Sequence, residues 1–186
     1  MRYLIMLLVA CFACISVCAQ TSPLTKKDQV LAATGAAKLP EKIRTWLDQN
    51  ISGWKLTPII TNEVQDRHKK EGIEYDPSFV WGDFDGDGQR DYVVGVSHQG
   101  PMGEFQMQFA FLRRGNGYEQ RQLTSAKAPD LKPDLDMARK GSSFTEYQTN
   151  KTIECPNDCI RIVPASGVRG LFRYENGDFK MFYTID

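Results

Sequence analysis

Apolar residues follow two different periods along this chain, and the change falls near Ser78. In the earlier part, Ile43, Trp46 and Leu47 recur at helical spacing behind Pro40, and proline is favoured at the first position of a helix. A Ser-Gly pair at residues 52–53 then interrupts the pattern. These features predict one short amphipathic helix that ends near residue 50.

From Ser78 onward the apolar residues follow a period of two, which is typical of strands. Residues 105–112 are the clearest case, because large apolar side chains alternate there with glutamine and alanine. Similar β-branched and aromatic runs recur up to the end of the chain. The pattern predicts strands over residues 79–81, 92–96, 105–112, 118–123, 144–152, 159–163, 168–174 and 179–183.

Turn sequences separate several of these predicted strands. Residues 115–117 read Gly-Asn-Gly and residues 175–178 read Glu-Asn-Gly-Asp, and such sequences favour tight hairpins because glycine and asparagine accept positive φ. Residues 130–136 are mostly polar and are interrupted by Pro133, so an exposed loop is expected there.

The predicted fold class is α+β, mainly β, with an antiparallel sheet of hairpins and one or two N-terminal helices packed on it. Residues 54–60 predict an extended segment, and the polar residues 62–71 predict a short helix or an exposed loop. The sequence contains no internal repeat, so it does not encode a complete propeller.

The first nineteen residues have the layout of an export signal. Arg2 precedes an apolar run over residues 3–17, and a small-residue cleavage site ends at Ala19. This layout predicts a signal peptide over residues 1–19, and the run is too short to span a bilayer. The alternative is a bacterial lipobox that ends at Cys11, which would attach a lipid anchor there. Both interpretations predict a protein that is secreted or periplasmic.

The mature chain has the composition of an ordinary globular domain. Residues 20–38 are weakly patterned and predict a linker or loosely ordered segment, whereas residues 39–186 have a length that suits a single globular domain. The formal net charge is +0, and no basic stripe is present. The sequence therefore predicts neither a nucleic-acid partner nor a membrane span.

Two cysteines remain after the predicted signal peptide. The chain has five cysteines, of which only Cys155 and Cys159 follow residue 19. An even pair in an exported protein predicts a disulfide, which here closes a small loop. No histidine or further cysteine lies nearby in the sequence to complete a zinc site.

The strongest chemical motif lies in residues 83–91, Asp-Phe-Asp-Gly-Asp-Gly-Gln-Arg-Asp. Carboxylates this closely spaced repel one another unless a cation lies among them, and a hard divalent ion that takes about six to eight oxygen ligands suits them. The ion predicted is Ca²⁺. Gly86 and Gly88 allow the backbone to curl around it with positive φ. The carboxylates occupy positions 1, 3, 5 and 9 of the loop, at Asp83, Asp85, Asp87 and Asp91.

The loop does not fit an EF-hand, because position 12 is Val94 instead of glutamate and both flanks predict strands. It resembles the calcium loop of FG-GAP and VCBS repeats, the short β-hairpin units of integrin-like propellers. That resemblance implies that the side chains of Asp83, Asp85, Asp87 and Asp91 and the backbone carbonyl of Gln89 bind calcium. The wider order of elements resembles small exported bacterial proteins with a single such motif.

Three functional hypotheses follow. The first is an exported, calcium-stabilised, non-enzymatic domain that binds a protein or a glycan through a sheet face or loops. The second is a periplasmic inhibitor or accessory subunit, which a small disulfide-closed domain would suit. The third is a hydrolase whose site is assembled from scattered carboxylates such as Asp134, Asp136 and Glu146.

Overall fold

The computed structural model describes residues 38–57, 66, 69–72, 78–127, 134–163 and 169–185. The predicted signal peptide, the lipobox alternative at Cys11 and nearly all of the predicted linker lie outside these residues, as does part of the extended segment predicted after the first helix. Within the described ranges, no helix combines the length and the apolar character that a membrane crossing requires.

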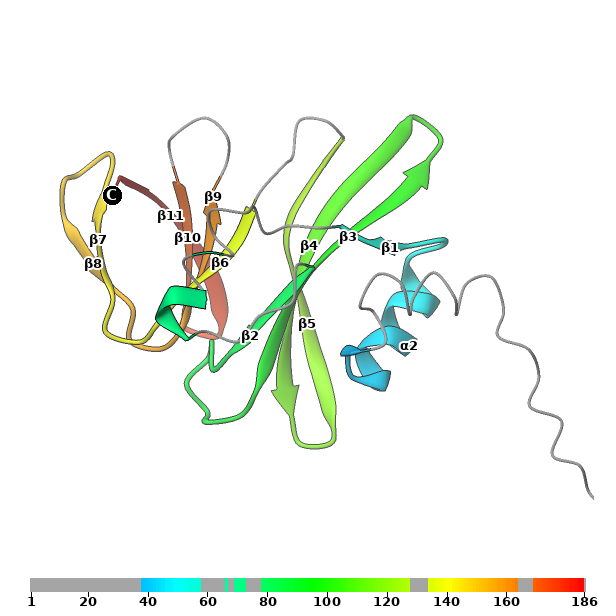
Figure 1. The fold of residues 1–186 in the computed structure, drawn as a ribbon, viewed down its shortest axis with the longest axis horizontal. Coiled ribbons are helices and arrows are strands. Elements are labelled where there is room, and N and C mark those ends of the chain that lie inside the picture. Colours follow the sequence, from blue (N-terminus) through cyan, green and yellow to red (C-terminus); the bar gives the residue numbers. More distant parts are fainter. Residues whose placement is uncertain are drawn as a thin grey trace, which may run out of the picture.

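Helix α2 and a series of strands are the main elements of the described part of the chain (Figure 1). Residues 66 and 69–71 are also helical. The main elements are α2 (Glu41–Asn50), β1 (Lys55–Leu56), β2 (Phe79–Gly82), β3 (Asp91–Gly100), β4 (Gly103–Arg114), β5 (Gly117–Lys127), β6 (Asp134–Ala138), β7 (Ser143–Glu146), β8 (Thr152–Glu154), β9 (Cys159–Val163), β10 (Arg169–Glu175) and β11 (Asp178–Ile185).

The strands form two antiparallel sheets. In the first sheet the order is β1-β3-β4-β5, and β2 also pairs with β3. In the second sheet the order is β6-β9-β10-β11-β7-β8. The prediction of a mainly β, antiparallel fold with an N-terminal helix is confirmed, and the division of the strands into two sheets is a feature that the sequence pattern did not reveal.

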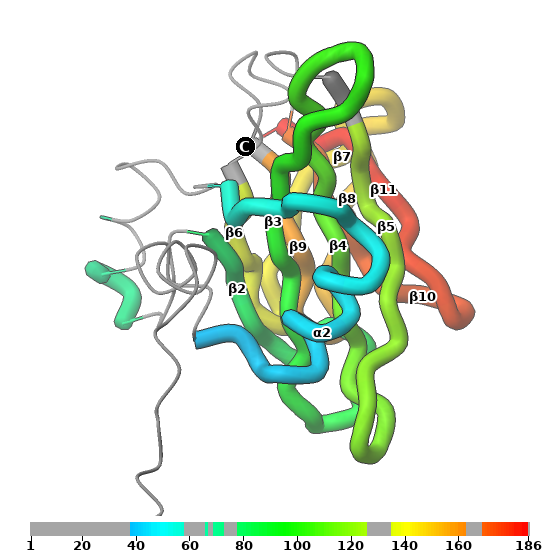
Figure 2. The backbone as a smooth tube through the Cα atoms, turned by 90° about the vertical axis from the view of Figure 1, so that its right-hand side faces the viewer, coloured from blue at the N-terminus to red at the C-terminus, as the bar shows by residue number. Residues whose placement is uncertain are grey.

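The first sheet is covered on both faces. Helix α2 lies against one face and the second sheet lies beyond the other (Figures 1 and 2). Because side chains alternate along a strand, neighbouring residues of β3 serve different cores. Val93 packs with Leu112 and Ile160 between the sheets, whereas Val94 packs with Leu47 beneath the helix. This two-sided burial explains why the central strands are so rich in apolar residues.

The structure corrects two of the sequence predictions. Residues 134–136, which were predicted as part of a loop, belong to strand β6, because Leu135 and Met137 point into the core between the sheets and β6 pairs with β9. The single strand predicted over residues 144–152 is instead the two paired strands β7 and β8. Asn150 adopts a φ of 54° in the connection between them, a left-handed conformation that asparagine tolerates and that reverses the chain.

The predicted turn between the last two strands is present. Asn176 and Gly177 have φ values of 54° and 88°, and β10 pairs with β11 on either side of them. Positive φ at both central residues is the signature of a type I′ hairpin turn, whose twist matches that of the flanking strands.

Cys155 and Cys159 lie at disulfide distance, with their Cα atoms 5.9 Å apart. The loop that they close connects β8 to β9, and both cysteines are buried against Leu171. The disulfide thus links the end of β8, at one edge of the second sheet, to the start of β9, near its other edge.

Reducing this disulfide is expected to lower the free energy of unfolding by roughly 2 kcal/mol, because a short loop restricts the unfolded chain only modestly. Urea unfolding of the oxidised and reduced wild-type domain measures this difference without changing a side chain. Intact mass spectrometry should show that reduction adds two hydrogens. Free thiols in the untreated protein would contradict the disulfide.

Candidate metal centre

The acidic loop connects β2 to β3 and is anchored in the core by its second residue. Gly82 and Asp91 are register partners at the ends of the two strands, so residues 83–90 form the connection. Phe84 is 0% exposed and packs in the core between the sheets. The loop is therefore tied to the hydrophobic core between its carboxylates.

The two loop glycines have the predicted left-handed backbone. Gly86 and Gly88 have φ values of 82° and 79°, which L side chains rarely adopt. Gly86 also lies against the disulfide loop, because a Cβ atom there would be 2.5 Å from Oδ1 of Asn157. A larger residue at Gly86 would thus meet both backbone strain and a steric clash.

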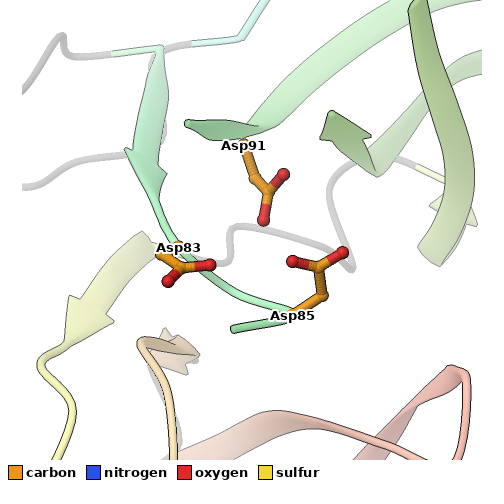
Figure 3. Close-up of side chains that lie close together, drawn as sticks. All are labelled: Asp83, Asp85 and Asp91. Carbon is orange, nitrogen blue, oxygen red and sulfur yellow. The ribbon is translucent and has the colours of Figure 1, made fainter. Parts of the chain in front are cut away.

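Three of the predicted carboxylates converge. Oxygen atoms of Asp83, Asp85 and Asp91 lie within 4.8 Å of one another (Figure 3). Asp91 is 0% exposed, and the side chain of Asp85 is only 4% exposed. Several anionic groups held this close and largely out of water create a strong demand for positive charge. The cluster can therefore hold a metal ion.

Backbone N–H groups of the loop stabilise these carboxylates in part. Oδ1 of Asp83 accepts a hydrogen bond from Gly86 N at 2.9 Å, and Oδ2 accepts one from Gly88 N at 3.1 Å. Oδ1 of Asp85 accepts one from Asp87 N at 3.2 Å. A carboxylate offers about four lone-pair sites, so each of these groups keeps acceptor capacity that a cation can use.

Asp91 is the most strongly perturbed member of the cluster. Its Oδ1 accepts a hydrogen bond from Arg113 N at 2.7 Å, and its Oδ2 accepts one from Phe84 N at 2.9 Å. Burial nevertheless raises the pKa of Asp91 to about 6, and the negative charge of Asp85 adds to this increase. The backbone hydrogen bonds oppose the increase without cancelling it. A nearby cation would favour the ionised form.

Asp87 and Gln89 lie beside the cluster of three. Oδ1 of Asp87 accepts a hydrogen bond from Gln89 N at 2.8 Å, and its Oδ2 accepts one from the side-chain amide of Gln89 at 2.9 Å. The Asp87 side chain is 31% exposed, far more than that of Asp85. Ligation by Asp87 and by the Gln89 carbonyl stays a prediction.

A cation that the sequence reasoning missed already contacts the loop. Arg114, at the end of β4, donates a hydrogen bond from Nη1 to Oδ2 of Asp85, and the same nitrogen lies 3.6 Å from Oδ2 of Asp87. The contact with Asp85 holds the pKa of Arg114 above its ordinary value. The guanidinium therefore supplies part of the positive charge that the loop demands.

A second missed residue, Asp158, joins the acidic loop to the disulfide loop. Asp83 N donates to Oδ2 of Asp158 at 3.1 Å, and Asp158 N donates to the carbonyl oxygen of Asp83 at 3.1 Å. Oδ1 of Asp158 also accepts a hydrogen bond from Lys140 N at 3.1 Å. These reciprocal bonds connect the two sheets at the edge of the carboxylate cluster.

A pocket of about 380 Å³ adjoins the outer side of the loop. Its lining includes Trp81, Asp83, Arg90 and Asp158, and the guanidinium carbon of Arg90 lies 5.8 Å from the centre of the Trp81 ring. Because Asp83 lines this pocket, solvent and small ions can approach the loop there.

The carboxylates proposed for a hydrolase site have a different setting. Asp136 is 1% exposed and lies opposite Arg161 in the register of β6 with β9, with Arg161 Nη1 3.5 Å from Asp136 Oδ2. Glu146 ends β7 and accepts a hydrogen bond from the hydroxyl of Thr149. Asp136 thus takes part in a buried ion pair inside the second sheet, which does not favour a role in binding a substrate.

No protein-family model matches this chain, and searches of the curated proteins and of the solved structures found no match either. The described residues show a β-rich protein with an aspartate cluster that can hold a metal ion.

The raised pKa of Asp91 predicts a pH dependence of stability in metal-free buffer. Its ordinary pKa of 3.8 rises to about 6 in the fold, so the folded state binds this proton more tightly than the unfolded state does. The resulting stabilisation is complete below pH 4 and is lost as the pH rises through about 6. The loss amounts to about 3 kcal/mol, from roughly two pKa units.

Urea unfolding of the wild type and of Asp91→Asn between pH 4 and pH 7 tests this prediction. The variant lacks the titrating group, so the wild type should lose stability relative to it by about 2.4 kcal/mol over that range, because the unfolded chain is already more than half ionised at pH 4. A difference that does not change with pH would contradict the assignment.

Proposed function

We propose that this protein is an exported, calcium-stabilised domain that acts by binding a partner and not by catalysis. The observation that carries the proposal is the convergence of oxygens from Asp83, Asp85 and Asp91 within 4.8 Å, in a loop that is buried at Phe84 and Asp91.

The chemistry of the loop favours calcium. Its side-chain donors are carboxylate oxygens, which hard cations prefer over nitrogen or sulfur ligands. Magnesium demands near-ideal octahedral geometry and gives up its waters reluctantly, whereas calcium accepts irregular sets of oxygen ligands. The resemblance to the FG-GAP and VCBS loop supports the fuller ligand set, in which Asp87 and the carbonyl of Gln89 join the three convergent carboxylates.

The position of the loop supports a structural role for the ion. The loop is anchored by Phe84 in the core between the sheets and is bonded to the disulfide loop through Asp158. An ion there would neutralise repelling carboxylates at a junction of the two sheets. It would stabilise the fold because binding to a site that exists only in the folded state adds to the free energy of unfolding.

Two features support binding over catalysis. Calcium does not readily generate a nucleophilic water at neutral pH, unlike zinc. The fold also exposes a strip of large side chains, comprising Met181, Tyr183 and Ile185 on β11 and Tyr147 just after β7, each at least 40% exposed. Tyr147 N donates to the carbonyl of Tyr183 at 2.8 Å, so these residues adjoin. Such a strip offers contact area for a protein or a glycan.

Export to the periplasm or the medium is part of the proposal. It rests on the signal-like sequence over residues 1–19 and agrees with the cysteine pair, because disulfides persist in oxidising compartments. Calcium is also available in those compartments.

Calcium at about 10 mM is expected to raise the melting temperature of the mature domain over the value in chelator. Extracellular sites often bind calcium at about 0.1–1 mM, so this concentration would add roughly 1.4–2.7 kcal/mol. For a domain of this size that corresponds to a shift of about 3–10 °C. Differential scanning calorimetry measures the shift, and isothermal titration measures the affinity.

The double variant Asp85→Asn/Asp87→Asn should lose both the heat of binding and the calcium-dependent shift. Asp66→Asn is the matched control, because Asp66 is an exposed aspartate outside the loop whose side chain is 76% exposed, and it should behave as the wild type. If the wild type shows neither binding heat nor a shift up to about 10 mM calcium, the proposed ion is wrong. If the double variant still binds, the ion lies elsewhere.

A further inference from the structure

Arg114 lies between the acidic loop and the second sheet. It is the last residue of β4, and its Nη1 contacts Asp85 and Asp87. On its other side, Nε donates to Oε2 of Glu119 at 3.0 Å, and Nη2 donates to the hydroxyl of Tyr174 at 3.4 Å. The guanidinium thus has one set of partners inside the loop and another set outside it.

We propose that Arg114 is an internal cation that competes with the metal ion for Asp85 and Asp87 and thereby sets the metal affinity of the site. This inference rests on the proposed calcium function. It adds a residue that the ligand set of the loop does not contain, 29 positions away from Asp85 in the sequence.

The metal ion and the Arg114 guanidinium compete because both are positively charged and both are attracted to the carboxylates of Asp85 and Asp87. The Asp85 side chain is 4% exposed, so its charge is poorly screened by water and needs a cation nearby. The guanidinium meets this need when no metal is bound. A divalent ion ligated by Asp85 and Asp87 would lie a few ångströms from the guanidinium, and like charges at that separation repel strongly in a partly buried site. The ion and the guanidinium therefore exclude each other from these two carboxylates.

Glu119 and Tyr174 can hold the guanidinium outside the loop when it leaves Asp85 and Asp87. Glu119 lies on β5 across the hairpin, and its other oxygen, Oε1, pairs with Arg121. The Arg114 and Glu119 side chains are 39% and 33% exposed, so a rotation of Arg114 within this region meets water and not the core. When an ion enters, Arg114 can release the loop and keep its contacts with Glu119 and Tyr174.

This competition predicts opposite effects on two measurable quantities. Arg114 stabilises the metal-free domain by neutralising the loop, and it weakens calcium binding because the ion must displace it. Neutralising Arg114 should therefore lower the melting temperature in chelator and tighten calcium binding. An arginine with a purely structural role would lower the melting temperature without tightening binding, so the affinity is the decisive readout.

The test is isothermal titration of the full mature domain with calcium, using the wild type, Arg114→Gln and Lys180→Gln. We expect Arg114→Gln to bind calcium about tenfold more tightly, as for the loss of a repelling charge in a partly buried site. Lys180→Gln is the matched control, because it removes one positive charge from an exposed position on β11 that pairs with Glu175. It should bind within about twofold of the wild type, since distant exposed charges are screened by salt.

A second variant keeps the proposal testable if Arg114→Gln does not fold. Glu119→Gln keeps an acceptor oxygen but removes the negative charge that holds the Arg114 guanidinium outside the loop, so calcium should bind about threefold more weakly to this single variant. Where Arg114→Gln does fold, the effect of Glu119→Gln should largely vanish in that background, because residues that act through one another are not additive.

The outcomes separate the two proposals. If the wild type binds calcium and Arg114→Gln binds it with equal or lower affinity, the competition is overturned and the calcium site stands. If the single variant Glu119→Gln binds calcium as tightly as the wild type, or weakens binding equally with and without Arg114, the movement of the guanidinium toward Glu119 is overturned. If no variant binds calcium up to about 10 mM, the proposed function itself fails, and this inference fails with it.

Discussion

The structure depends on keeping an anionic loop at the junction of two sheets. Asp91 begins β3 with a wholly buried carboxylate, and Phe84 anchors the same loop in the core between the sheets. Moving the loop into water would relieve the charge repulsion but would also expose that phenylalanine and undo the pairing of β2 with β3. The fold therefore retains the carboxylates and must compensate their charge locally.

Compensation comes from several parts of the chain. Backbone N–H groups of the loop itself bond the carboxylates of Asp83, Asp85 and Asp91, and Arg113 adds its own N–H to Asp91. The Arg114 side chain then brings a full positive charge from the end of β4. Hydrogen bonds alone leave the pKa of Asp91 raised, so the remaining demand for positive charge is what makes a metal ion chemically reasonable here.

The disulfide loop and the acidic loop form one structural unit across the two sheets. Asp158 lies inside the loop closed by Cys155 and Cys159, and it exchanges hydrogen bonds with the backbone of Asp83. A constraint on either loop therefore restricts the other. The cysteine pair and the aspartate cluster that can hold a metal ion therefore constrain the same junction of the fold.

The sequence by itself determined most of the strands, most of the turns and the candidate site. Strand alternation and positive-φ turn residues act between neighbours in the chain, so β3, β4 and the turn at Asn176 could be predicted, as could the approach of Asp83, Asp85 and Asp91. Only the tertiary structure decided that β6 is a strand, that the strands divide into two sheets, and that Asp87 lies beside the cluster. It alone brought Arg114 and Asp158 to the loop, across 29 and 75 residues. The reason is that the local sequence pattern sets the direction of each side chain along a strand. Which distant residues neutralise the charge of the loop depends instead on how the two sheets pack.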